Sequence, residues 1–199
     1  LENQPKNRPI LRLSAVSTCS RRVRIMTARE LEEYSALRAT IRERGTTRVW
    51  IALAGLAVWA ALTVATAALA TLPIASLLPL LVLAAAFEVV FALHTGVERI
   101  GRYIQVFFEA PGERAWEHTA MAFGRAFPGG GSDPLFAPYF AMATVLNLVP
   151  AALARPVAIE WLVVGLPHLL FVVHLWRSRR RSAMQRAIDL ERFEKLKNE

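Results

Sequence analysis

One carboxylate in this sequence stands where a charge is costly. Glu88 lies in an otherwise apolar stretch that is long enough to cross a bilayer. A charged side chain at the bilayer centre costs some ~2.5 to 3.5 kcal/mol on insertion scales. We therefore expect Glu88 to be protonated, paired or facing a polar cavity, as intramembrane acids of proton and ion pathways are. The alternative is a neutral acid that holds helices together through a hydrogen bond to Asn147 or Thr144.

A second group of polar side chains follows directly along the chain. His94, Glu98 and Arg102 recur at every fourth residue, so they share one face of a helix. A His and a Glu at this spacing can supply two metal ligands, and Glu117 or His118 could complete the site. The spacing is also common, and we prefer a ladder of interfacial ion pairs in which Glu precedes Arg, the favourable order.

The remaining candidates for chemistry are weaker. His168 and His174 are six residues apart, which places them on different faces of a regular helix. The single cysteine, Cys19, excludes an internal disulfide framework. The sequence contains no zinc-protease motif, nucleophile elbow, phosphate-binding loop or dinucleotide fingerprint. We therefore predict no catalytic residue, no bound metal and no cofactor.

Composition indicates which elements position these residues. The chain is 54% hydrophobic with a mean hydropathy of +0.33, values typical of membrane proteins. The net charge of +8 could suggest nucleic acid, but the arginines lie beside apolar runs without interleaved aromatic residues. We interpret the arginines as signals of membrane topology and predict no nucleic-acid partner.

The apolar runs predict an all-α integral membrane protein with four transmembrane helices. The expected spans, within a domain of residues 49–176, are residues 49–72, 77–95, 135–154 and 157–176. The short connections after the first and third spans predict two antiparallel hairpins. Pro138, Pro150 and Pro167 are expected to kink the second hairpin.

Amphipathic helices are expected outside the membrane. A capping box at Thr27 and Glu30 begins the first, in residues 26–48, which either ends near Gly45 or continues into the first span. Residues 96–134 form an interfacial segment, with Trp116, Ala120, Phe123 and Phe127 on one stripe and a flexible linker over 128–134. Residues 177–199 are predicted to form a basic tail helix that opens at Ser182. Residues 1–25 are expected to be disordered, or to come from an over-extended gene prediction.

Arginine-rich segments precede the first span, separate the second from the third, and follow the fourth. The positive-inside rule places them, and both termini, in the cytoplasm of a bacterium, with the spans in the inner membrane. The preferred function is a non-enzymatic subunit, assembly factor or scaffold, embedded in the lipid bilayer, that forms homo-oligomers or meets a protein partner at the cytoplasmic face. One alternative is an oligomeric proton- or cation-coupled transporter or channel that uses Glu88 and Asn147. A weaker alternative is a metal-dependent membrane enzyme that uses His94 and Glu98.

Overall fold

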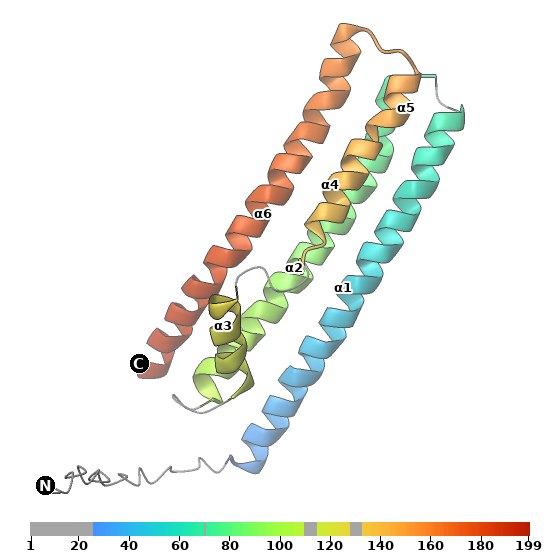
Figure 1. Cartoon of the computed structure of the whole chain (residues 1–199). Coiled ribbons are helices and arrows are strands. Elements are labelled where there is room, and N and C mark those ends of the chain that lie inside the picture. The colour runs from blue at the N-terminus through green and yellow to red at the C-terminus, as the bar shows by residue number, and fades with distance from the viewer. Residues whose placement is uncertain (1–25, 70, 110–114, 128–132) are drawn as a thin grey trace, which may run out of the picture.

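The computed structural model describes residues 26–69, 71–109, 115–127 and 133–199. The described elements are α1 (Ala28–Leu69), the 3-10 turn η1 (Pro73–Ser76), α2 (Leu77–Phe107), α3 (Trp116–Ala126), α4 (Ala137–Leu146), α5 (Leu148–Leu153) and α6 (Ala158–Asn198). No strand occurs in these residues, which confirms the all-α prediction. Figure 1 shows α1, α2 and α6 running along the molecule, with α4 and α5 stacked end to end beside α2. The predictions for residues 1–25 and for most of the linker lie outside the described residues.

The long helices identify a membrane protein. By length and composition, α1, the unit Pro73–Phe107 and α6 are each able to cross a membrane. The apolar unit Ala137–Leu153 is shorter. At about 1.5 Å per residue it is roughly 25 Å long, whereas the hydrocarbon layer is about 30 Å thick. Three helices are therefore candidate spans by length and composition, and the fourth span and the pairing into hairpins stay predictions.

Helix α1 joins the amphipathic segment to the first apolar run without a break. It begins at the predicted capping box, in which the Thr27 backbone N–H donates to Glu30 at 2.8 Å and the Glu30 N–H donates to Thr27 Oγ1 at 3.2 Å. The helix continues through Gly45, the position where it was expected either to end or to continue. A single glycine costs about 1 kcal/mol in a helix, and the preceding Arg42, Glu43 and Arg44 favour helix.

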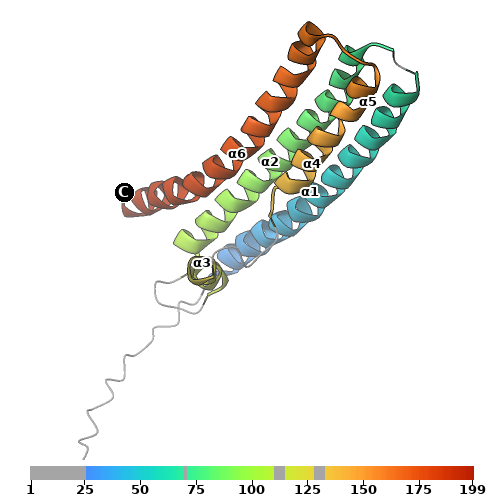
Figure 2. The ribbon, with the colours of Figure 1, turned by 45° about the horizontal axis from the view of Figure 1, so that its top comes forward.

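Helix α6 is also continuous, which corrects the prediction of a new tail helix at Ser182. Ser182 lies inside α6 and is buried against His94 of α2. It is therefore a packing position instead of a helix start. The helix also passes through Pro167, as membrane helices can when the freed backbone groups find other partners. Figure 2 shows that α6 is curved along its length.

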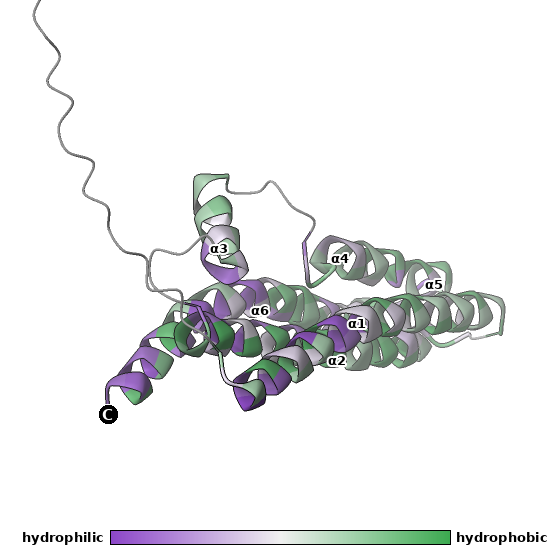
Figure 3. Cartoon of the chain, turned by 90° about the horizontal axis from the view of Figure 1, so that it is seen from below, coloured by the Kyte–Doolittle hydropathy of each residue, from purple (hydrophilic) through white to green (hydrophobic). Residues whose placement is uncertain are grey.

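The core of the bundle and one of its ends differ in character. Around Phe87, which is fully buried, rings of Phe140 and Phe171 pack edge-on at 5.4 and 6.1 Å between centroids. Figure 3 shows hydrophilic residues gathered toward the start of α1, the base of α3 and the C-terminus. We call this the polar end and define it as the described residues within 26–48, 94–109, 115–127 and 177–199.

Candidate functional site

Glu88 lies on the outer surface of the bundle and not in its interior. Its carboxylate Oε1 is 2.5 Å from Nε2 of His174 on α6, and the side chains are 56% and 38% exposed. The inner face of α2 is filled by Leu83, Phe87 and Val90. Because Glu88 follows Phe87 directly, the helix turns it away from the core. Glu88 therefore does not join Asn147 and Thr144, and it pairs with a histidine that the sequence had not linked to it.

Asn147 is the centre of a separate buried network of hydrogen bonds, which we call the polar knot. It lies where α4 ends and α5 begins, and it is fully buried. Its Nδ2 donates to the Ser76 carbonyl at 2.7 Å and to Nε2 of His168 at 3.0 Å. Its Oδ1 accepts from Nε1 of Trp59 at 3.2 Å and lies 3.2 Å from the Thr63 hydroxyl. Three of the four hydrogen-bonding positions of the amide are thus occupied, because the single Thr63 proton lies closer to the Trp59 carbonyl, at 2.8 Å.

These bonds give Asn147 a structural role. They join α1, η1 and α6 at one point inside the apolar region, where a polar group without partners is costly. Thr144, also buried, donates only to the Phe140 carbonyl of its own helix, at 2.7 Å. With both N–H groups donating and Oδ1 accepting from Trp59, the Asn147 amide is used in contacts between helices.

His94 is held between two helices. Nη1 of Arg48 on α1 lies 3.0 Å from its Nδ1, and the Ser182 hydroxyl of α6 lies 3.0 Å from its Nε2. Arginine has no acceptor, so Nδ1 of His94 must accept, and its proton sits on Nε2. The lone pair that a metal would need is therefore already used by Arg48.

The stripe of His94, Glu98 and Arg102 connects helices and does not form a ladder along α2. Glu98 pairs with Nε of Arg186 on α6 at 3.0 Å. Arg102 pairs with Oε2 of Glu117 on α3 at 3.5 Å. Within the described residues, no three His, Cys, Asp or Glu side chains lie close enough to hold a metal ion.

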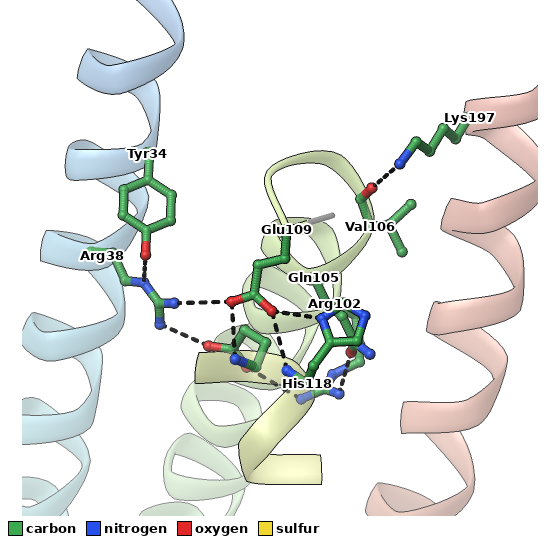
Figure 4. A network of polar contacts seen from close by, with 9 residues as sticks. Tyr34, Arg38, Arg102, Gln105, Val106, Glu109, His118 and Lys197 are labelled. Carbon is green, nitrogen blue, oxygen red and sulfur yellow. Dashed lines mark hydrogen bonds and ion pairs between the residues drawn. The ribbon is translucent and has the colours of Figure 1, made fainter. Parts of the chain in front are cut away.

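Glu109 fixes α3 in place, as Figure 4 shows from close by. This buried carboxylate accepts from the backbone N–H groups of Glu117 at 2.9 Å and His118 at 3.1 Å, in the first turn of α3. It also lies 2.8 Å from Nδ1 of His118 and 3.7 Å from Nη2 of Arg38. A carboxylate at a helix N-terminus satisfies unpaired donors and complements the helix dipole. Glu109 thus caps α3 from the end of α2.

Two arginines complete this network by holding Glu117. Arg38 of α1 donates through Nη1 to Glu117 Oε1 at 2.7 Å and through Nε to the Tyr34 hydroxyl at 3.1 Å. Arg102 donates to Gln105 at 2.7 Å. Burial acts to lower the pKa of Arg38, but hydrogen bonds to Tyr34 and Glu117 outweigh it, so its pKa lies above the usual value. The network joins α1, α2 and α3 through buried, paired charges.

A cleft of ≈ 450 Å³ opens beside this network. We call it the polar-end cleft. It combines apolar side chains with paired charges, and its lining residues are Arg38, Ile41, Val97, Glu98, Gly101, Arg102, Trp116, Glu117, Ala120, Met121, Gly124 and Arg186. Trp116 at its edge is 70% exposed, whereas Glu117, the next residue, is buried. The cleft therefore has fixed walls and an exposed aromatic rim.

Sequence reasoning missed Glu109, Arg38 and the partnership of Glu88 with His174. A signal existed for Glu109, since an acid just before Pro111 and Gly112 stands where one helix ends and another begins. For Arg38, the amphipathic spacing showed only an exposed charge. His118 and Glu117, which were considered as metal ligands, instead bind Glu109 and the arginines. The site is a set of fixed donors and acceptors.

Comparison of the chain with protein-family models, with curated proteins and with solved structures finds no match.

Proposed function

We propose that this chain is a multi-pass protein of the bacterial inner membrane that acts as a non-enzymatic subunit, assembly factor or scaffold. One observation carries the proposal: buried ion pairs fix α3 beside the polar-end cleft, while Trp116 stays exposed at its rim. The charges of the network bind one another and thereby set the shape of the cleft. A preformed apolar pocket with an exposed aromatic rim favours recognition of a partner.

Topology supports a cytoplasmic location for the polar end. Arg177, Arg179, Arg180 and Arg181 follow the last apolar run, and further arginines precede the first. The positive-inside rule favours the cytoplasm for both termini, with α4 and α5 together as a fourth span. Phe123 and Phe127, exposed on the same stripe of α3 as Trp116, would then rest in the membrane interface.

The chemistry of the cleft indicates what it recognises. Ile41, Val97 and Met121 offer apolar contacts, and Arg186, which binds Glu98 through Nε, offers its other N–H groups as donors at the wall. Tryptophan and arginine dominate binding hot spots because they combine a large apolar area with hydrogen-bond donors. The partner we propose is a protein segment that presents an apolar side chain next to an acidic one.

Co-purification with a matched pair of variants tests this function. Full-length protein is isolated from its own membranes in mild detergent, as wild type, Trp116→Ala and Trp50→Ala. Trp50 is a similarly exposed tryptophan on the apolar part of α1. We expect one protein at constant stoichiometry with wild type and Trp50→Ala, and about tenfold less with Trp116→Ala. Equal recovery with all three, or no protein at constant stoichiometry, would contradict the proposal.

A second candidate function rests on the pair of Glu88 and His174. A carboxylate and an imidazole in contact at membrane depth are typical of proton relays. Because the pair is exposed on the outer surface of one chain, a transport pathway would have to run between copies in an oligomer. Labelling of Glu88 with a carbodiimide tests this candidate.

A further inference from the structure

A second cleft lies between α2 and α6, where the apolar part of the bundle meets the polar end. Its volume is ≈ 380 Å³. We call it the α2–α6 cleft. Its lining residues are Phe91, Thr95, Arg99, Arg181, Ser182, Met184, Gln185 and Ile188. It is distinct from the polar-end cleft, with which it shares no lining residue.

The charged residues that line the α2–α6 cleft are both arginines. The polar-end cleft differs, because Glu98 and Glu117 line it together with arginines. The buried carboxylate of Asp189 positions Arg99, with Oδ2 lying 3.5 Å from the arginine Nε. Nε2 of Gln185 donates to the other oxygen of Asp189, Oδ1, at 2.8 Å. Arg181 forms no ion pair within the described part of the chain. One positioned and one unpaired guanidinium thus border the same cleft.

Along the membrane normal, the cleft lies at the level of the lipid headgroups. Arg181 follows Trp176, the last residue of the apolar run, by five positions, and Arg99 follows Leu93 by six. At about 1.5 Å per residue these arginines lie roughly 7 to 9 Å beyond the hydrocarbon edge. The headgroup layer of each leaflet is about 5 to 8 Å thick, so flexible arginine side chains at the cleft reach it.

The cleft continues into an apolar surface. Phe91 lines its inner end, and Leu170 of α6, on the same face of its helix as Arg181, lies exposed further into the apolar region. The nearest acid in that direction, Glu88, is already in contact with His174. A lipid phosphate could therefore rest between the arginines while its acyl chains follow the groove between α2 and α6.

We propose that the α2–α6 cleft binds the phosphate group of an anionic phospholipid in the leaflet at the polar end. Basic pockets between transmembrane helices bind such headgroups because charge-assisted bonds form where the dielectric constant is low. The selectivity comes from net charge: a zwitterionic lipid presents a cation that the two arginines disfavour. This site is independent of the proposed partner binding, which concerns the other cleft.

Native mass spectrometry of detergent-solubilised full-length protein tests the site. The protein is equilibrated with equal amounts of phosphatidylglycerol and phosphatidylcholine that carry identical acyl chains. We expect wild type to retain the phosphatidylglycerol about tenfold more often, and Arg99→Gln/Arg181→Gln to retain both lipids equally. A control, Arg29→Gln/Arg42→Gln, removes the same charge from exposed positions of α1, none of whose residues line the cleft, and is expected to keep the preference.

Three results would overturn the proposal. The first is equal retention of both lipids by wild type, and the second is an unchanged preference in the double variant. The third is displacement of the phosphatidylglycerol by millimolar inorganic phosphate, which would assign the cleft to a free phosphate compound. Circular dichroism shows whether the double variant folds. If it does not, the single variant Arg181→Gln is used instead, because that change breaks no ion pair of the described residues.

Discussion

Asn147 and His168 are joined by a hydrogen bond whose direction is fixed by a third group. Nδ1 of His168 lies 2.7 Å from the Val164 carbonyl, which can only accept, so its proton is on Nδ1. Nε2 of His168 must then accept from Asn147 at 3.0 Å. The knot that joins α1, η1, α5 and α6 is therefore one defined arrangement of protons. Its role is to hold these elements together inside the apolar region.

Replacement of Asn147 tests that role. Asn147→Leu keeps a similar volume but leaves His168 and Trp59 without their partner inside the apolar region. We expect a loss of about 2 kcal/mol of unfolding free energy, since buried bonds in membrane proteins contribute up to about 1.7 kcal/mol each. Thermal unfolding in detergent measures it. Thr66→Val, which removes a bond to α1's own backbone at Thr63, serves as control, and equal effects of the two variants would argue against the knot.

Close packing of α1 on α2 depends on Gly55. A Cβ at Gly55 would overlap the Cβ of Ala86 on α2, whereas a Cβ at Gly45 has no heavy atom within 4 Å. We expect Gly55→Ala to destabilise the protein by about 1 to 3 kcal/mol through overpacking. Gly45→Ala should stabilise α1 by about 0.5 to 1 kcal/mol. Unfolding midpoints measure both, and a shift of the same sign for the two variants would show that the helices do not pack as described.

Glu109 is predicted to control the order of α3. Glu109→Gln removes the charge that caps α3 and binds Arg38, so α3 should detach more often from α2. Hydrogen exchange of the amides of α3 is expected to accelerate about tenfold, which corresponds to about 1.4 kcal/mol. Glu43→Gln, at an exposed position of α1, is expected to change little. Unaltered exchange in Glu109→Gln would mean that the cap does not hold α3.

Labelling of Glu88 separates the two candidate functions. An apolar carbodiimide attacks protonated carboxyls from the bilayer, and the exposure of Glu88 makes it accessible. We expect labelling in native membranes that disappears in Glu88→Gln. If Glu88 takes part in cation transport, excess cation protects it. Labelling that is insensitive to cations would remove cation-coupled transport from the second candidate.

The sequence predicted the helices well because their signals are local. The capping box at Thr27, the apolar runs and the common helix face of His94, Glu98 and Arg102 each follow from neighbouring residues. The continuity of α6 was missed because Ser182 resembles a helix start, and its burial against His94 depends on a contact between distant helices.

The site could be predicted only in part for the same reason. The period of α2 put His94, Glu98 and Arg102 on one face, but which helix each residue meets depends on packing. Glu88 and His174 show this most clearly, since a rotation of α2 by one residue decides between core and surface. Partners across helices are tertiary information that residue spacing does not carry.

Site-specific photo-crosslinking tests partner binding at the polar-end cleft most directly. A photoreactive amino acid replaces Met121, which lines the cleft, or Leu166, which is exposed on the apolar part of α6. Irradiation of native membranes is predicted to give one discrete adduct with another protein from position 121, lost in the Trp116→Ala background, and none from position 166. Absence of a protein adduct at position 121, or an adduct that Trp116→Ala leaves unchanged, would contradict the account.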